Sequence, residues 1–549
     1  MKYMRPVLLA MSLFMVGTVF VTTPVSPAVA DDVSGKRLYR DGLLPSGEPV
    51  RAVVKNGTVW SGADAACVKC HRRSGLGDSE GRYAIRPIAG RLLFEYGNAA
   101  AGTSEHRPTY TQATLARALR DGVDPSGRTL DSLMPRYDLS DGDVAQLAAY
   151  LRELSSGAVP GVGDTAIHFA TIVAPGVEPA KAMAMLDVLH AFFGDKNAGT
   201  RKESRRRAVG REQMYRAYRT WELHVWELTG PAETWRDQLE ASYREQPVFA
   251  LLGGIGAGDW QPVHAFCEHN EIPCVFPDVD FPVVAESDYY SIYFSRGVTL
   301  EAEVLAKYLA EETRQGRRRS TEPIMQVFRD DAAGRMPAQA LRAALRREGM
   351  GNPVDRTVVA GSDAVATEFW AKLLSDGRGG TLVVWLNGAD VQSLAAAGAL
   401  PADMRGLYLS ASLLSGKRPT LPAAWSDSLD KVRLVYPFDL PVGREQRLAR
   451  MKTWLRAKNI PLSDERIQAN AYFAATVVGD AVTHMLDNFS RDYFIERIEH
   501  VTGKSLSSAI YPRLSLGPGQ RFASKGGYVV RFAPDGENRL VPLSGWIIP

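Results

Sequence analysis

Two cysteines separated by two residues and followed directly by a histidine constrain this chain more than any other feature. They are Cys67, Cys70 and His71. At this spacing two thiols can add to the vinyl groups of a haem while the adjacent imidazole becomes an iron ligand. The alternatives are a dithiol or disulfide beside an incidental histidine, or half of a zinc site. The sequence has no second Cys-x-x-Cys to complete a zinc site. We therefore predict one covalently bound haem c, with His71 as an axial ligand.

The sixth position of the iron needs a second ligand if the haem is to exchange electrons. Met134 is the single methionine between His71 and residue 150, and Pro135 follows it. Methionine raises the reduction potential relative to a second histidine. The other possibilities are a core role for Met134, with His106 or water at the sixth position. We predict that Met134 is the second axial ligand.

Residues 1–30 have the features of a secretory signal peptide. Lys2 and Arg5 precede an apolar run, and Ala28 and Ala30 come before two aspartates. The run is shorter than the roughly 20 residues that span a bilayer, and no later segment is apolar enough to do so. We expect a periplasmic protein with no membrane span after removal of the signal peptide.

Length and composition indicate several domains and no nucleic-acid partner. A chain of 549 residues suggests two or three domains. Its formal charge of +3 gives no general case for nucleic-acid binding. Small residues and proline dominate residues 155–164, which predicts a linker between residues 31–154 and 165–549.

Residues 31–154 resemble a class I cytochrome c domain. The resemblance rests on a short helix around Gly35–Tyr39, the Cys-x-x-Cys-His motif, the Met134-Pro135 loop and a closing helix that ends Leu-Ala-Ala-Tyr-Leu-Arg-Glu-Leu. It implies a small all-α domain whose terminal helices cross beside the haem, with one haem edge exposed for electron exchange. The insert Arg72–Arg107 is longer than is typical of this family.

Beyond the linker, short apolar runs alternate with longer amphipathic stretches, which is typical of βα units around a mainly parallel sheet. The expected strands are His168–Val173, Leu223–Leu228, Val248–Gly253, Pro273–Phe276, Ile324–Phe328, Thr357–Ala360, Thr381–Leu386, Gly406–Ser410 and Val432–Pro437. The expected helices include Pro179–Phe193, Thr234–Glu245, Gln261–Asn270, Leu300–Thr313, Ala338–Arg347 and Ala469–Leu486. So many strands favour two α/β lobes over one sheet.

Residues 165–549 resemble the type I periplasmic solute-binding proteins, the branched-chain amino-acid receptor superfamily. The segments that carry the resemblance are Phe249–Gly254, Glu271–Pro277, Tyr293–Gly297, Val327–Asp331 and a closing Gly-rich hairpin near Gly526–Phe532. The resemblance implies a two-lobed domain that holds its ligand in the cleft between the lobes and closes on a hinge.

Ligand-binding loops of open α/β sheets follow the carboxyl ends of the strands. The loops at those ends are Gly254–Asp259, Asp278–Asp280, Arg329–Asp331 and Asn387–Asp390. From them we select candidate ligand contacts, which are Gly256, Asp259, Asp278, Asp280, Asp330 and Asn387. Ordinary turn and helix-capping chemistry is the alternative. The first loop has no Ser or Thr hydroxyl for an α-carboxylate, which argues against an amino acid as the ligand.

Cys267 and Cys274 are the two cysteines outside the haem motif. Because the periplasm is oxidising, we expect a local disulfide between them. Two buried thiols or a reactive redox pair are the alternatives.

No nucleophile elbow, phosphate loop or HExxH helix is present in the sequence, so we do not expect an enzyme. We expect an electron-transfer cytochrome whose solute-binding-like module docks a redox partner protein, a dehydrogenase or another cytochrome, or senses a small molecule. One alternative is the solute receptor of an ABC transporter with an appended haem redox sensor. Another is a redox enzyme acting on a substrate in the cleft, which a Met134 ligand disfavours by filling the sixth position.

Overall fold

The structure is a computed structural model that divides into two compact units, Met1–Ser156 and Gly157–Pro549. Their boundary falls inside the predicted linker over residues 155–164, and most of the predicted signal peptide lies outside the described residues. The structure describes residues 27–80, 83–95, 108–207, 219–285, 288–361, 363–376, 380–414, 425, 428–486, 488–503, 509–533 and 539–549. Within these ranges, no helix combines the length and the apolarity needed to cross a membrane.

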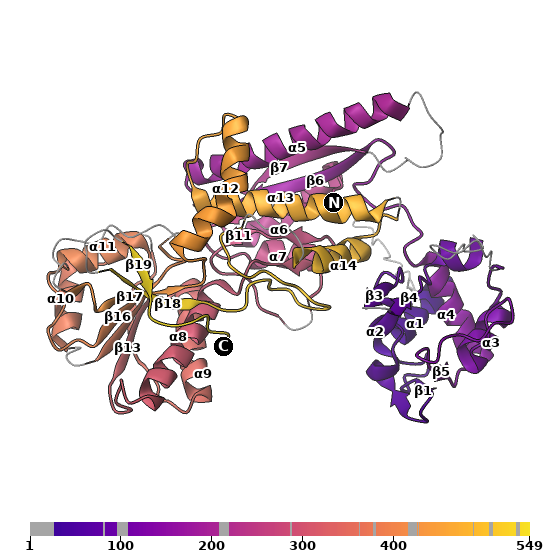
Figure 1. The fold of residues 1–549 in the computed structure, drawn as a ribbon, viewed down its shortest axis with the longest axis horizontal. Coiled ribbons are helices and arrows are strands. Elements are labelled where there is room, and N and C mark those ends of the chain that lie inside the picture. The colour runs from indigo at the N-terminus through magenta and orange to yellow at the C-terminus, as the bar shows by residue number, and fades with distance from the viewer. Residues whose placement is uncertain are drawn as a thin grey trace, which may run out of the picture. The chain divides into compact units, whose positions relative to one another are not determined.

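Two helices that pack against each other organise the first unit, α1 (Pro27–Asp41) and α4 (Asp141–Glu153). Gly35 permits their close approach, since a Cβ there would lie 2.3 Å from the backbone oxygen of Gln146. The rings of Tyr39 and Tyr150 meet beside this point, with centroids 5.4 Å apart. A third helix, α3 (Gln112–Asp121), also contacts α4 (Figure 1).

The start of α4 is fixed by a capping box. The Ser140 side chain accepts from the backbone N–H of Asp143, and the Asp143 carboxylate accepts from the backbone N–H of Ser140. Both bonds satisfy amides that have no partner within the helix. Val144, Leu147 and Leu151 are buried in the core of the unit, as the periodic apolar stripe of the sequence predicts.

The expectation of an all-α domain was wrong in one respect, because the first unit also contains short antiparallel strands. The strands are β1 (Arg51–Val53), β2 (Val59–Ser61), β5 (Arg136–Tyr137), β3 (Asp78–Glu80) and β4 (Tyr83–Ile85). An Asn56-Gly57 turn joins β1 to β2, with Gly57 at φ +82°. An Asn-Gly dipeptide is a strong hairpin signal, and it explains the departure from helix. Short helical turns complete the unit: η1 (Gly62–Ala65), α2 (Val68–His71) and η2 (Arg91–Glu95).

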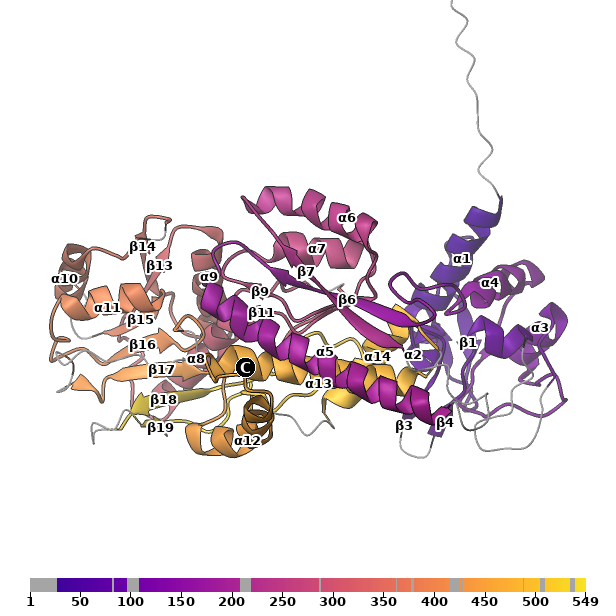
Figure 2. The same cartoon turned by 90° about the horizontal axis from the view of Figure 1, so that it is seen from above.

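A parallel sheet begins the second unit. Its described strands are β6 (Ala166–Val173), β7 (Thr220–Glu227), β8 (Ala250–Leu252), β9 (Ile255–Gly256), β10 (Cys274–Val275), β11 (Asp278–Val279) and β12 (Ser291–Ile292). They are ordered β11-β9-β6-β8-β10-β12, with β7 paired to β6. One face packs on α5 (Pro179–Arg207) and α13 (Glu465–Met485), and the other on α6 (Trp235–Glu245) and α7 (Gln261–His269) (Figure 2).

A second sheet follows in the same unit. Its described strands are β13 (Ile324–Arg329), β14 (Val354–Val358), β15 (Thr381–Trp385), β16 (Gly406–Ser410), β17 (Val432–Tyr436), β18 (Tyr528–Phe532) and β19 (Leu540–Pro542). The order is β14-β13-β15-β16-β17-β18-β19, and only the last two strands run antiparallel to their neighbours. Helices α8 (Gly297–Arg314) and α9 (Ala332–Arg347) cover one face, and α10 (Thr367–Asp376) and α11 (Gly388–Ala396) the other (Figure 1).

Two further helices pack against the first sheet's layer, α12 (Pro441–Ala457) and α14 (Arg491–Thr502). Trp454 of α12 contacts Tyr472 of α13 at 5.0 Å between ring centroids, and Phe494 of α14 contacts Phe249 at 4.9 Å. Although α12, α13 and α14 lie between β17 and β18 of the second sheet in the chain, they help to enclose the core around the first sheet.

Candidate haem site and candidate ligand cavity

The three residues of the haem motif lie on one helical turn. The backbone N–H of His71 donates to the carbonyl oxygen of Cys67 at 2.9 Å, and that of Cys70 donates to the same oxygen at 3.3 Å. Cys67 occupies the N-cap position of α2. The structure therefore presents both thiols and the imidazole from a single short element, and no disulfide joins the two cysteines.

The imidazole of His71 is oriented by the insert that follows the motif. Its Nδ1 lies 3.0 Å from the backbone oxygen of Arg86. A carbonyl oxygen can only accept, so Nδ1 carries the proton and Nε2 keeps its lone pair. Removal from solvent lowers the pKa of His71 to about 4, against a smaller opposing effect of this hydrogen bond. The imidazole is thus neutral at pH 7, as a metal ligand must be.

Burial, with a smaller contribution from the nearby Cys70, raises the pKa of the Cys67 thiol to about 12. A thiol held in this protonated form is a poor nucleophile. Tyr137 lies beside Cys67 and donates its hydroxyl proton to the backbone oxygen of Ala65 at 2.9 Å.

Met134 packs against the same hydrophobic cluster as Cys67 and is partly buried. Its loop is held by the Asp131 backbone oxygen, which accepts from the Met134 N–H at 3.1 Å, and by the Arg136 guanidinium, which donates to the Met134 carbonyl. The alternative ligand His106 lies outside the described residues. Two thiols, a neutral imidazole with a free Nε2 and a thioether are a donor set that fits a covalently bound haem.

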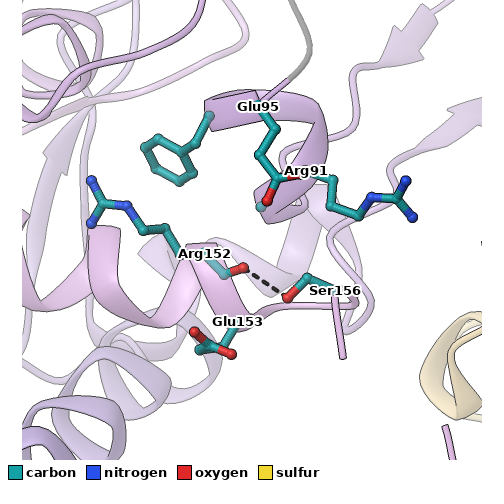
Figure 3. A pocket seen from close by; sticks show the side chains of 7 residues that line it. Arg91, Glu95, Arg152, Glu153 and Ser156 are labelled. Atoms are coloured by element: carbon teal, nitrogen blue, oxygen red, sulfur yellow. Dashed lines mark hydrogen bonds between the residues drawn. The ribbon is translucent and has the colours of Figure 1, made fainter. Parts of the chain in front are cut away.

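A separate cavity of about 520 Å³ in the first unit lies between η2 and the end of α4 (Figure 3). Arg91 and Glu95 line it from η2, and the Arg152 guanidinium lies 4.6 Å from the centroid of the Phe94 ring. The Ser156 hydroxyl donates to the Arg152 backbone oxygen at 2.8 Å. The predicted haem ligands are not among its lining residues.

A larger cavity of about 660 Å³ lies in the second unit, at the carboxyl ends of parallel strands from both sheets. Four of the six predicted ligand contacts line it: Gly256, Asp278, Asp280 and Asn387. Asn387 also accepts a hydrogen bond from the backbone N–H of Asp390 at 3.1 Å and so caps α11. The ligand-contact and capping interpretations of Asn387 are therefore compatible.

The other two predicted contacts lie elsewhere. Asp259 is exposed before α7, where it accepts from the Gln261 N–H at 2.9 Å. Asp330 is half exposed and pairs with Arg335 at 2.7 Å, whereas its neighbour Asp331 lines the cavity. The position of a loop at the carboxyl end of a strand predicts that the loop lies near the ligand. It does not predict which side chains of the loop point inward, because backbone direction changes at each residue of a turn.

Arg466 bridges the two aspartates of the cavity. It donates to Asp278 at 2.6 Å and to Asp280 at 3.0 Å. Burial alone would lower the pKa of Arg466, but the two carboxylates outweigh it and raise that pKa well above its ordinary value. Burial raises the pKa of Asp280, partly offset by Arg466. Asn470 donates to the second oxygen of Asp278 at 2.8 Å.

Arg466 also connects the two sheets, since it donates to the backbone oxygen of Ser412 after β16 at 3.4 Å. Nearby, Gly297 begins α8 at φ +53°, and a Cβ there would lie 2.2 Å from the backbone oxygen of Asp280. Only glycine accommodates this conformation and this approach. The segment Tyr293–Gly297, selected from the sequence, thus passes directly behind the aspartate loop.

Sequence reasoning missed several residues that line the cavity. These residues are Lys181, Trp385, Asp464 and Arg466. Asp464 caps α13 by accepting from the Ile467 N–H at 3.1 Å. Recognised in the sequence as an N-cap residue, Asp464 would have moved the predicted start of this helix from Ala469 to a point before Arg466.

The expected disulfide between Cys267 and Cys274 is not formed in this structure. Both residues are buried free cysteines. They belong to the apolar cluster under α6 and α7, where cysteine packs as a small hydrophobic residue. Burial raises the pKa of Cys267 well above its ordinary value, so a reactive thiolate is disfavoured.

Comparison with known proteins gives different matches for different parts of the chain. The family model described as cytochrome c matches residues 61–155. No curated protein sequence matches the chain.

Several solved structures share the fold of the larger part of the chain. A solute-binding protein of an ABC transporter from R. palustris, in complex with benzoate, has a TM-score of 0.51 at 14% identity, covering 70% of this chain and 97% of that one. A possible leucine/isoleucine/valine-binding protein from Rhodopirellula baltica has a TM-score of 0.50 at 14% identity, covering 69% and 97%. A substrate-binding periplasmic protein from Ralstonia solanacearum has a TM-score of 0.50 at 13% identity, covering 68% and 99%. Residues 61–155 therefore form a cytochrome c domain, and the rest of the chain includes an α/β domain with the fold of the type I, branched-chain amino-acid receptor-like periplasmic binding proteins.

Proposed function

We propose that this protein is a periplasmic electron-transfer cytochrome c whose binding-protein module recognises a small molecule or docks a redox partner. The observation that carries the proposal is the orientation of His71, whose Nδ1 is engaged by the Arg86 carbonyl while Met134 packs on the same cluster as Cys67. The proposal includes a signal peptide over residues 1–30 and a single covalent haem.

The residues of the first unit have distinct roles in this account. A haem held by Cys67 and Cys70 supplies one-electron redox chemistry. The Arg86 carbonyl keeps the His71 Nε2 lone pair available, and His71 and the Met134 thioether would together hold the haem iron. Iron held by both side chains would have no position left for an exogenous ligand, which favours electron transfer over turnover of a substrate on the iron. We therefore propose that the protein is not an enzyme.

In the second unit, we propose a two-lobed receptor in which the cavity of about 660 Å³ is the ligand cleft. Cavities of this size hold small molecules. Arg466 contacts Asp278 on one side and the Ser412 backbone on the other, so a ligand that competes for this guanidinium would change the contact between the sheets. The lining combines charged groups with Trp385, which favours a small polar molecule that carries an apolar portion. The proposed redox partner is a dehydrogenase or another cytochrome.

Carbon monoxide tests the electron-transfer assignment directly, because it binds reduced haem iron only where an axial position is open. We expect the absorption spectrum of the reduced wild-type protein to be unchanged by carbon monoxide, and that of Met134→Ala to change. Leu133→Ala, at the exposed neighbouring position, is the matched control and should behave as the wild type. Carbon monoxide binding by the wild type would favour gas binding or substrate chemistry and would contradict the proposal.

The fold of the second unit also supports a transport receptor with an appended haem sensor. Genes for a permease and an ATPase beside the coding gene would favour transport. A neighbouring dehydrogenase gene would favour electron transfer.

A further inference from the structure

Three side chains on the first sheet of the second unit form a cluster of metal-ligating groups. His168 lies on β6, and Glu222 and His224 lie on β7. The parallel register places His168 opposite Glu222, and His224 opposite Ala170. Because alternate residues of a strand share a face, all three side chains are on the same side of the sheet. None of them lines the ligand cavity.

The spacing of the donor atoms suits one metal ion. His168 Nδ1 lies 3.1 Å from His224 Nε2 and 3.3 Å from the Glu222 carboxylate. One ligand atom from each residue lies within 4.8 Å of the others. Two ligands bound at about 2.0–2.1 Å with a tetrahedral angle are about 3.3–3.4 Å apart, close to both measured distances.

Hydrogen bonds within the cluster cannot satisfy both neighbours of the His168 Nδ1 atom. Nδ1 of His168 faces both an imidazole nitrogen and a carboxylate oxygen, and a neutral imidazole has at most one proton at that atom. If this proton is donated to the His224 imidazole, it is not available to the Glu222 carboxylate, and the reverse also holds. A single cation between the three groups would meet all three lone pairs together.

The cluster is open enough for an ion to enter. The His168 side chain is 21% exposed and that of Glu222 is 52% exposed. Water can therefore complete the coordination shell. The mixed imidazole and carboxylate donors suit a borderline divalent ion such as Zn²⁺, and the absence of a thiolate from the set disfavours softer ions.

We propose that His168, Glu222 and His224 form a binding site for a divalent transition-metal ion of the Zn²⁺ class. Among the strands that the structure describes, β7 pairs with β6 alone. An ion held by residues of both strands cross-links β6 and β7 and stabilises this edge of the sheet.

Isothermal titration calorimetry with ZnCl₂ tests the proposal on the full-length haem-loaded protein, prepared without a histidine tag and treated with a chelator. We expect a saturable site that His224→Ala and Glu222→Gln each weaken by roughly tenfold or more, since loss of even an outer-shell partner weakens metal sites by about 10–100-fold. His190→Ala removes an exposed imidazole from α5 and is the control, which should bind Zn²⁺ as the wild type does.

Thermal unfolding gives a readout that separates binding from misfolding. Zn²⁺ should raise the melting temperature of the wild type and of His190→Ala, but not that of His224→Ala. Glu222→Gln preserves the shape of an exposed side chain, so its loss of Zn²⁺ affinity should occur with an unchanged melting temperature in the absence of metal. An affinity equal in the wild type and these two cluster variants, or no binding by the wild type, would overturn the proposal.

Discussion

The Nδ1 atom of His71 lies 3.0 Å from the backbone carbonyl oxygen of Arg86, fifteen residues further along the chain. This contact connects the segment that follows the haem motif to the motif itself and sets the tautomer of the imidazole. Hydrogen bonds of this kind orient metal-ligating histidines and increase their basicity. The segment after the motif thus supplies an orienting group for the predicted iron ligand.

Replacing Met134 by histidine should lower the reduction potential of the haem. Two imidazole ligands favour the oxidised iron relative to imidazole and thioether. We expect a decrease of roughly 0.1 V or more, within the about 0.8 V range that axial ligands set. Spectroelectrochemical titration measures it, and Leu133→His is the control for adding an imidazole to this loop. Equal potentials for Met134→His and the wild type would show that Met134 is not a ligand.

Substituting Gly35 by alanine should destabilise the first unit. The new Cβ would meet the Gln146 carbonyl at 2.3 Å and the Tyr150 Cβ at 2.7 Å, and overpacking of this kind costs about 1–3 kcal/mol. Gly142→Ala, near the start of α4, meets only the Ser140 hydroxyl at 3.7 Å and should be neutral or stabilising. Denaturant unfolding followed by haem absorbance reports on this unit alone. Equal stability of the two variants would contradict the tight crossing of α1 and α4.

Removing the Arg466 guanidinium should destabilise the second unit. Arg466→Met leaves Asp278 and Asp280 without their cation, and uncompensated buried charge costs about 3–5 kcal/mol. Chemical denaturation followed by tryptophan fluorescence measures this loss. Adding Asp278→Asn and Asp280→Asn to the variant should restore part of the stability. If the single substitution left the free energy of unfolding unchanged, the bridge would have no structural role.

Glu301 should make the stability of the second unit depend on pH. It is 1% exposed, and burial raises its pKa from 4.5 to about 7 against hydrogen bonds from Ser410 and Ser412. Between these values the native state binds the proton that the unfolded chain releases. The contribution of protonated Glu301 to the stability of the native state is therefore complete below about pH 4.5 and is lost as the pH rises towards 7.

Glu301→Gln provides the measurement. The free energy of unfolding of the wild type minus that of Glu301→Gln should fall by roughly 3 kcal/mol from pH 4.5 to pH 7. Glu233→Gln, at an exposed position, should follow the wild type across this range. A constant difference between wild type and Glu301→Gln would show that Glu301 titrates normally.

Much of the α/β architecture follows from sequence pattern. Each of the nine expected strands overlaps a strand of the structure, because buried parallel strands are short runs of apolar residues between turn residues. The two-residue strands β9, β11 and β12 were not expected, since they are too short to give a periodic signal. Helices α10 to α12 and α14 were not among the helices whose bounds were predicted. In α12 the apolar residues are spread around the helix instead of along one face, so its sequence has no amphipathic pattern to detect.

The candidate sites were likewise predictable only where they depend on local sequence. Local spacing predicts the haem motif, because Cys67, Cys70 and His71 are presented by one turn of helix. The cavity needs segments far apart in the chain, and Arg466 reaches Asp278 from 188 residues away. The metal-ligand cluster has the same origin, since pairing of β6 with β7 brings His168 to His224 across 56 residues. Contacts of this kind depend on strand order and register, which a single sequence does not encode locally.

We propose that the chain carries one covalent haem, and the mass of the denatured protein shows whether it does. Protein is isolated from the periplasm of a host that matures c-type cytochromes and analysed by mass spectrometry under native and denaturing conditions. We expect that the denatured wild type retains the mass of one haem and that the variant with Cys67→Ser and Cys70→Ser does not. We also expect that a cavity ligand is lost only on denaturation. A denatured wild-type mass equal to the polypeptide alone would contradict the account.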